Sequence, residues 1–269
     1  MNINSNYTNI QDINNYQSST LEKLGTAQDI NNSSDNPSGL LVVDNLDLQQ
    51  NSISQSINNA NSGIAMSNIA QSGIASQKEL LENIKIETQK AMNGTMNDDD
   101  KEIIAKQISK YIDQYDKIAQ ETNYNGNSLL KVSDDEIEND ISIAGDNNKI
   151  VSMEKADTLS VSDQLKGLMS DFANNPNSMK DMLDVVDKGM EQLAKYAGDF
   201  GSSSNSLASS IRNSLNTETE IARSQSTVLD IDYNKEVSNF SKANLQAQIG
   251  MFVHSQANAI QSRNIALLT

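Results

Sequence analysis

The 269-residue chain has no cysteine and no tryptophan, and it has one histidine, His254. The absence of cysteine excludes a zinc ribbon, a thiol enzyme and a disulfide-stapled scaffold. A single histidine leaves too few ligands for a His-pair metal site and removes most catalytic triads. We therefore expect no catalytic residue, no metal site and no cofactor, and we predict that the protein is not an enzyme.

Basic residues are also scarce, with 20 Lys and Arg against 36 Asp and Glu and a formal net charge of -16. Such a chain lacks the basic patch that neutralising several phosphates requires, so we expect no nucleic acid partner. Apolar runs stay shorter than about 18 residues, which argues against a membrane-spanning helix and a membrane partner. No charged segment followed by an apolar run precedes Lys23, so we expect no Sec-type signal peptide.

Proline occurs twice, at Pro37 and Pro176, and between these breaks the few apolar residues are strongly periodic. Spacings of three and four run from Ile53 to Ala91, and the same pattern recurs on both sides of Pro176. The pattern predicts helices over 41–92, over about 98–122 with Asn97 or Asp98 as the N-cap, and over 178–226. A last amphipathic run covers 237–268.

Alternation of apolar and polar residues is clear in one segment, from Asp140 to Met153, around Gly145-Asp146-Asn147-Asn148. This pattern predicts one small β-hairpin, and we find no other convincing strand signal. The fold class is therefore predicted as mostly α, a long antiparallel helical rod or coiled coil with one small β-hairpin region. The two chain ends are polar helices that carry too little large apolar surface to be stable alone.

Several sequence motifs resemble those of bacterial flagellins. The stretch 30–40, INNSSDNPSGL, resembles the flagellin element INSAKDDAAGL, and 236–243, EVSNFSKA, resembles EVSNMSKA. The run 221–233 resembles the flagellin segment that precedes it, and the chain closes on Leu267-Leu268 as flagellins do. Asn93-Gly94-Thr95 and Thr122-Asn123-Tyr124-Asn125-Gly126 stand where flagellins carry ANGT and TQFNG.

The resemblance implies a structural subunit that self-assembles into the helical filament of the bacterial flagellum for motility, secreted by type III export and located outside the cell. It implies terminal helices that pair as an inner coiled coil and fold on polymerisation. The implied partners are other copies of the chain, an export chaperone, the filament cap and the hook-junction proteins. The implied division is 1–37 and 228–269 as inner-core helices, 38–131 and 176–227 as the helical rod, and 132–175 as a short exposed hairpin or irregular segment.

Residues that match the terminal motifs are the candidates for assembly. They are Asn32, Asp35, Gly39, Leu40, Asp232, Glu236, Val237, Asn239, Phe240, Gln248, Gly250, Gln256, Asn258, Leu267 and Leu268. The resemblance also suggests glycosylation of hydroxyls in the exposed segment, for which the candidates are Ser142, Ser152, Thr158, Ser160 and Ser162.

Two departures from the family pattern concern contacts with other proteins. Gly25 to Ile30 replaces the flagellin SSGLRI, so an acid, Asp29, stands in place of a base and one familiar contact between subunits is in doubt. By position, Asn83 and Glu87 replace the Arg and Leu that the innate immune flagellin receptor reads. We therefore expect weak or absent recognition by that receptor.

Two alternatives remain open at this point. One is the hook-filament junction protein of the same superfamily, although its usual C-terminal ending differs from 265–268. The other is a secreted coiled-coil binding protein that never polymerises. The acidic run Asp98-Asp99-Asp100 fits the start of a helix better than a metal site, because carboxylates there complement the helix dipole.

Overall fold

The computed structural model describes residues 3–132, 140–144, 150–172 and 175–268, and it is mostly α, as the sequence predicts. Its residues form two compact units. The terminal unit comprises 1–51 and 217–269, and the central unit comprises 52–216. The elements are α1 (Ile3–Thr26), α2 (Pro37–Ala91), α3 (Asp98–Glu121), β1 (Asn123–Tyr124), β2 (Asn127–Ser128), β3 (Asp140–Ala144), β4 (Ile150–Glu154), α4 (Leu159–Met169), α5 (Pro176–Leu229) and α6 (Tyr233–Leu268).

In the central unit, α2 and α5 run antiparallel with their apolar faces together. Lys85 on α2 is paired with Asp187 on α5 at 2.6 Å. Leu81 lies against Gly189, whereas Gly63, earlier on α2, lies against Leu207, later on α5. Of the residues that the three-and-four spacing predicts for the seam, Ile74, Ile84, Val186, Leu193 and Phe200 are buried in this core. The prediction was wrong for Leu215, which is 47% exposed.

Helix α3 begins where the sequence predicts, because Asn97 caps it. The side chain of Asn97 accepts a hydrogen bond from the N–H of Asp100 at 2.7 Å, and the three acids Asp98–Asp100 occupy the first turn. Its buried face includes Ile104, Ile108 and Tyr115. The acidic run is therefore placed as a helix start.

Strands β1 and β2 form a short hairpin that the sequence analysis did not predict. Asn123 pairs with Ser128 and Tyr124 with Asn127, and the turn residues Asn125 and Gly126 have φ of 50° and 85°. Asn-Gly is the preferred pair for a two-residue turn with positive φ at both positions. The signal was therefore present, but strands of two residues are too short to show alternation.

Strands β3 and β4 form the predicted antiparallel hairpin, with Ser142 opposite Ser152 and Ile141 opposite Met153. The turn expected at Gly145-Asp146-Asn147-Asn148 lies outside the described residues. Ile143 and Met153 are buried, while Ser142 and Ser152 face solvent. A Cβ on Gly63 would lie 2.3 Å from Cδ1 of Ile143, so a glycine lets the hairpin approach α2.

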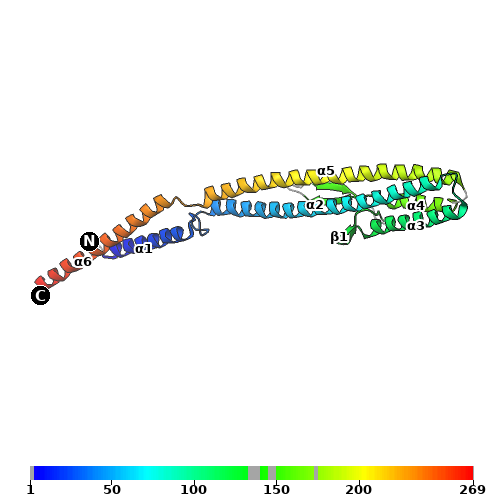
Figure 1. Ribbon diagram of the computed structural model, residues 1–269. Helices are drawn as coiled ribbons and strands as arrows, with labels where there is room; N and C mark the ends of the chain where they lie inside the picture. Colours follow the sequence, from blue (N-terminus) through cyan, green and yellow to red (C-terminus); the bar gives the residue numbers. More distant parts are fainter. Residues whose placement is uncertain (1–2, 133–139, 145–149, 173–174, 269) are drawn as a thin grey trace. The chain divides into compact units, whose positions relative to one another are not determined.

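The segment after this hairpin contains a helix, α4, that the sequence analysis did not predict. It packs along α3 (Figure 1). Val161, Leu165 and the following Phe172 are buried in the core of the central unit. The expectation of an irregular exposed segment over 132–175 was therefore wrong for this part, because its apolar residues are buried. Two backbone hydrogen bonds, from Ala156 to Leu129 and from Thr158 to Leu130, hold its start in place.

In the terminal unit, α1 and α6 pack against each other. Helix α1 ends at Thr26 instead of continuing toward Pro37, because Ala27 takes the left-handed conformation with φ of 59°. A left-handed residue directly after the last turn is a usual way to end a helix. The residues between α1 and α2 are therefore a structured loop, which the sequence analysis did not separate from the first helix.

Candidate functional site

The loop between α1 and α2 pairs with the joint between α5 and α6, as an antiparallel bridge between Gln28 and Asp230. On one side of the bridge, the N–H of Asp29 donates to the carbonyl of Leu229 at 2.6 Å. On the other side, the N–H of Ile231 donates to the carbonyl of Ala27 at 3.3 Å. The residues that precede α2 and those that precede α6 are thus fixed to each other. We call this region, residues 22–40 and 226–239, the terminal joint.

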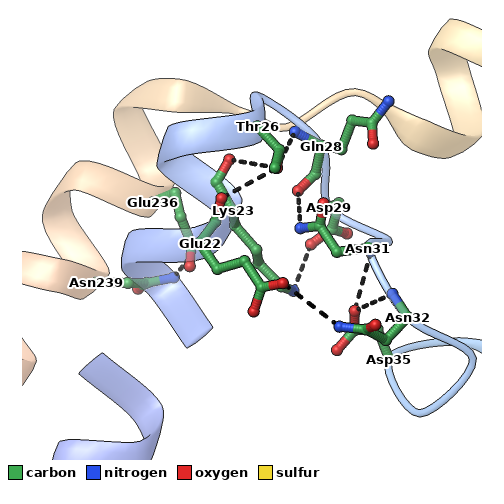
Figure 2. Close-up of polar contacts among 10 residues, drawn as sticks. All are labelled: Glu22, Lys23, Thr26, Gln28, Asp29, Asn31, Asn32, Asp35, Glu236 and Asn239. Atoms are coloured by element: carbon green, nitrogen blue, oxygen red, sulfur yellow. Dashed lines mark hydrogen bonds and ion pairs between the residues drawn. The ribbon is translucent and has the colours of Figure 1, made fainter. Parts of the chain in front are cut away.

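Asp35 holds the loop of the terminal joint closed. Its carboxylate accepts hydrogen bonds from the N–H groups of Asn31 at 3.0 Å and Asn32 at 2.9 Å, as Figure 2 shows. Its own N–H donates to the carbonyl of Asn32 at 2.9 Å. The two donated hydrogen bonds lower the pKa of Asp35 below its usual 3.8, because they stabilise the charged form.

Lys23 lies near several acids of the terminal joint (Figure 2). Its Nζ lies 2.7 Å from Oδ1 of Asp29. The hydrogen bond to Asp29 is the main cause of a raised pKa of Lys23, and the charges of Asp29, Glu236 and Asp35 add to it. Lys23 therefore links the end of α1 with the loop, and the charge of Glu236 at the start of α6 acts on it from a distance. Asn32 adds a weaker contact to Glu22 at 3.5 Å.

The start of α2 explains the flagellin-like stretch 30–40 residue by residue. Asn36 caps the helix, since its Oδ1 accepts a hydrogen bond from the N–H of Gly39 at 2.9 Å. Pro37 stands in the first turn, where a missing N–H costs nothing. A Cβ on Gly39 would lie 2.6 Å from Cδ1 of Ile30, so Gly39 leaves the space that the buried Ile30 fills. Leu40 beside it is half-buried.

The start of α6 is capped in a similar way. The side chain of Asp232 accepts a hydrogen bond from the N–H of Lys235 at 3.1 Å. Glu236 in the first turn accepts a hydrogen bond from Nδ2 of Asn239 at 3.0 Å, shown in Figure 2. Asp232 therefore sets where α6 begins, and the contact between Glu236 and Asn239 supports its first turns.

Farther along α6, small residues are buried where the helix contacts α1. Ala243 and Ala247 are buried, as is Thr20 on α1. Gly250, one turn later, is half-buried. Short side chains at these positions leave room for the two helices to approach each other closely.

The remaining predicted assembly residues lie on less buried positions of α6. Val237 is exposed and Phe240 is half-buried. Gln248 and Asn258 are exposed and make contacts within the helix, to Asn244 and His254, and Gln256 is exposed. Leu267 and Leu268 belong to α6, but their side chains lie outside the described residues.

Large apolar side chains are distributed unequally between the two units. Among the side chains that the structure describes, thirteen of the eighteen exposed large hydrophobic residues belong to the terminal unit. These are Tyr16, Leu21, Leu41, Val42, Leu48, Tyr233, Val237, Leu245, Ile249, Met251, Phe252, Val253 and Ile260. In the same set, five of the thirty-two buried hydrophobic residues belong to this unit: Ile30, Val43, Ile221, Ala243 and Ala247.

The glycosylation candidates divide by exposure. Ser142 and Ser152 are exposed on one face of the β3–β4 hairpin, opposite each other. Ser160 is half-buried. Thr158 and Ser162 are buried, and Thr158 donates its hydroxyl to the carbonyl of Leu130 at 2.9 Å. A modifying enzyme would reach Ser142 and Ser152 most easily in the folded chain.

Lys23, Ile30 and Asn36 are important residues of the terminal joint that the sequence analysis did not single out. The signal for Asn36 was available, because Asn before Pro is a common helix start. The role of Lys23 depends on contacts that form only in the folded chain.

Within the described residues, no cluster of three or more His, Cys, Asp or Glu side chains is arranged to hold a metal ion. In the same part of the chain, none of the helices combines the length and apolar content needed to cross a bilayer.

Comparisons with known proteins agree with these motifs. The family model of the bacterial flagellin N-terminal helical region matches residues 1–135, and that of the bacterial flagellin C-terminal helical region matches residues 183–268. The flagellar filament 31.3 kDa core protein of Treponema maltophilum is 23% identical, over 94% of this chain and 92% of that protein. The flagellin of Halalkalibacterium halodurans is 20% identical, over 88% of this chain and 86% of its own length.

Two solved structures share the fold. The crystal structure of Bacillus cereus flagellin is similar with a TM-score of 0.51 and 22% identity, and the match covers 58% of this chain and 88% of that one. A putative flagellar hook-associated protein from Vibrio parahaemolyticus is similar with a TM-score of 0.65 and 14% identity, over 73% of this chain and 100% of that one. Given the family models that match both ends of the chain and the relatives that align along most of it, this chain belongs to the bacterial flagellin family and is a structural subunit of the flagellar filament.

Proposed function

We propose that the terminal unit is the part of this flagellin that polymerises, and that α1 and α6 complete their folding when copies of the chain associate. The observation that carries this proposal is the unequal distribution of apolar side chains. The terminal unit exposes residues such as Phe252 and Leu48, at 71% and 68%, while few of its described apolar side chains are buried. Ordering a residue costs about 1–2 kcal/mol in backbone entropy. The small amount of apolar surface that the terminal unit buries within one copy offsets this cost poorly.

Contacts between copies supply the missing burial. Exposed positions on α6, among them Leu245, Ile249 and Phe252, gain apolar contacts when neighbouring copies cover them. Folding and assembly are then a single event, which prevents polymerisation before export. Contacts of this kind, if they are repeated head to tail without closing a ring, build an open helical filament.

The terminal joint gives α6 a defined starting point for this step. Asp35, Lys23 and Asp232 organise the loop and the first turn of α6 through hydrogen bonds within one chain. The helix then needs only to be extended and covered by neighbours. The functional division expected from the sequence, with 1–37 and 228–269 as the inner core and the helical rod over 38–131 and 176–227, is part of this proposal.

Export and the other partners follow from the family. We infer that the chain leaves the cell through the flagellar type III system, assisted by an export chaperone, and that it meets the filament cap and hook-junction proteins outside. The protein acts by assembly and catalyses no reaction. Ser142 and Ser152 are the hydroxyls that we propose as glycosylation acceptors, because both are exposed on the β3–β4 hairpin.

Recognition by the innate immune flagellin receptor is proposed to be weak. Asn83 and Glu87 stand on α2 where many flagellins carry the Arg and Leu that this receptor contacts. A reporter cell line exposed to purified monomer tests this point, and a response as strong as that to an enterobacterial flagellin would contradict it.

The first experiment on assembly is hydrogen exchange on monomer and filament. We expect amides of α1 and α6 to exchange rapidly in the monomer and slowly in the filament, while those of α3 and the core stretch of α2 are protected in both. Equal protection of α6 and α3 in the monomer would refute folding on assembly.

A pair of variants tests which unit drives growth. Phe252→Ser removes an exposed apolar side chain from the terminal unit, and Ile103→Ser removes one, 65% exposed, from the central unit. Filament growth from seeds in a sulfate buffer is measured by electron microscopy. We expect it to fall strongly for Phe252→Ser and little for Ile103→Ser. Equal losses would contradict a special role of the terminal unit. If the wild-type chain forms no tubes even when filament seeds are added, the result would instead favour a junction protein or a secreted rod.

A further inference from the structure

The turn between α2 and α3 contains an Asn-Gly pair, Asn93-Gly94, whose geometry favours a chemical modification. Two Asn-Gly pairs occur in the chain, and the second is Asn125-Gly126 in the β1–β2 turn. Asparagine before glycine is chemically labile, because the glycine nitrogen can attack the asparagine side-chain carbonyl with little steric hindrance. The structure places these two pairs in very different environments.

The side chain of Asn93 is held over the peptide that follows it. Its Oδ1 accepts hydrogen bonds from the N–H of Thr95 at 3.4 Å and from the hydroxyl of Thr95 at 3.1 Å. An asparagine oxygen that reaches the N–H two residues ahead forms an Asx turn, which places its carbonyl carbon beside the intervening nitrogen, here that of Gly94. The side-chain carbon and its attacking nitrogen are therefore neighbours in the folded chain.

The two contacts with Thr95 also stabilise the charge that develops during attack. When the Gly94 nitrogen adds to Cγ of Asn93, negative charge accumulates on Oδ1. The N–H and hydroxyl of Thr95 already point at that oxygen, as donors do in an oxyanion hole. A Cβ built on Gly94 would meet nothing within 4 Å, so nothing blocks the approach on this side.

From this geometry we infer that Asn93 is a site of spontaneous deamidation in the folded protein. The Gly94 nitrogen loses its proton and forms a bond to Cγ of Asn93, the Cγ–Nδ2 bond breaks, and ammonia leaves a five-membered succinimide. Water then opens the ring at one of its two carbonyls, giving aspartate or isoaspartate. No oxidant, reductant or enzyme is needed, because water is the only co-reactant.

Asn125 is the internal comparison. Asn125 and Gly126 have φ of 50° and 85°, and the paired residues Tyr124 and Asn127 hold the turn on both sides. Rotating the Asn125 backbone to bring its side-chain carbon to the Gly126 nitrogen distorts the hairpin. Both asparagines are exposed, so the difference between them lies in the backbone: strand pairing on both sides constrains Asn125, whereas Asn93 lies in a turn between two helices.

The modification changes the charge at a helix end. It adds one negative charge two residues after Ala91, the last residue of α2, where the helix dipole is already negative. Asn93 also shares a surface pocket with Asp98 and Lys101. The product therefore places a further carboxylate close to the three acids in the first turn of α3.

Peptide mapping by mass spectrometry after incubation of the intact chain in mildly alkaline buffer tests the inference. We expect deamidation at Asn93 to be about tenfold faster than at Asn125, which corresponds to about 1.4 kcal/mol in activation free energy. In urea strong enough to unfold the chain, the two rates should become similar. Equal rates in the folded chain, or a faster rate at Asn125, would overturn the proposal.

Two variants identify the cause. Thr95→Val removes the hydroxyl donor and keeps the backbone N–H, and we expect it to slow deamidation of folded Asn93 about fivefold, the factor that one hydrogen bond supplies. Gly94→Ala, which the fold accommodates, should nearly abolish the reaction. An unchanged rate in Thr95→Val would show that the glycine alone sets the rate and would refute the activating role of Thr95. Circular dichroism of each variant checks that the fold is retained.

Discussion

The Cδ1 atom of Ile30 lies 2.6 Å from the position that a Cβ atom on Gly39 would occupy. Real side-chain carbons do not approach this closely, so any larger residue at 39 requires the side chains of Ile30 and Asn36 to shift. Ile30 is one of the few buried apolar residues among the described residues of the terminal unit. The glycine of the flagellin-like stretch is thus explained by packing and not by a special backbone conformation.

Gly39→Ala should destabilise the terminal joint, because the new methyl group collides with Ile30 and Asn36. Overpacking of this kind costs about 1–3 kcal/mol, and the better helix propensity of alanine offsets about 1 kcal/mol of that. Hydrogen exchange at the amides of Asn31 and Asn32 reports the opening of the loop. We expect faster exchange in Gly39→Ala.

Ile30→Val supplies the matched test, since it removes only Cδ1. In the Gly39→Ala background it should restore slow exchange in part, because the collision with Asn36 remains; this is a non-additive effect of two residues in contact. Gly25→Ala in α1, where a Cβ meets nothing within 4 Å, should have no such effect. Additive effects of Ile30→Val and Gly39→Ala would show that the two residues do not share one space.

Asp35 should make the loop sensitive to acid. Its pKa in the folded chain is lowered from 3.8, mainly by the N–H groups of Asn32 and Asn31. Because folding lowers the pKa of Asp35, the carboxylate stabilises the loop fully above pH 3.8. This stabilisation is lost as pH falls through the lower pKa of the folded state. We expect NMR titration of the Asp35 carboxyl carbon to give a midpoint below 3.8, and Asp35→Asn to remove the acid-dependent opening. A midpoint at or above the ordinary value would contradict the two hydrogen bonds.

Lys23 should give the opposite dependence at high pH. Its pKa is raised above 10.5, first by the hydrogen bond with Asp29. The ion pair therefore stabilises the joint fully below pH 10.5 and is lost as pH rises through the higher pKa of the folded state. Because the pair is partly exposed, Asp29→Asn should cost less than about 1 kcal/mol. It should also lower the midpoint of the Lys23 Nζ titration more than Glu236→Gln does, and the reverse order would contradict the assignment.

Gln77 should be important for the stability of the central unit. Its buried amide donates to the hydroxyl of Thr158 at 2.9 Å and to the carbonyl of Tyr115 at 3.3 Å. It therefore ties α2 to α3 and to the residue that precedes α4. Gln77→Ala loses these hydrogen bonds and leaves a cavity, so we expect a loss of about 2–4 kcal/mol in urea unfolding.

The control for this prediction is Ser76→Ala, at the exposed neighbouring position of the same helix, with an expected effect within about 0.5 kcal/mol. A double-mutant cycle with Thr158→Val measures the shared hydrogen bond directly. Zero coupling between Gln77 and Thr158 would show that the contact contributes nothing to stability.

The sequence determined the long helices, because their evidence is local and repeated. The three-and-four spacing of residues such as Ile74, Ile84 and Leu193 recurs over many turns, and Pro37, Asn97 and Pro176 mark the helix starts. The β3–β4 hairpin was predictable for the same reason, since apolar and polar residues alternate over four residues of each strand, 140–143 and 151–154. The terminal motifs pointed to the family through residue identity alone.

Only the tertiary structure decided the role of residues whose partners are distant in the chain. Helix α4 is short, and it is stable because Val161 and Leu165 are buried against elements far away in sequence, so its own residues gave a weak signal. The same burial hides Thr158 and Ser162, two of the five hydroxyls that looked accessible in the sequence.

The terminal joint shows this division most clearly. The sequence determined that Asp35, Gly39 and Asp232 belong to flagellin-like motifs. The fold decided what they do, because hydrogen bonds to backbone groups, the close approach of Ile30 to Gly39 and the ion pair of Lys23 exist only after the loop has closed onto the α5–α6 joint. Periodicity is a local property that a sequence displays directly, whereas these contacts depend on three-dimensional proximity.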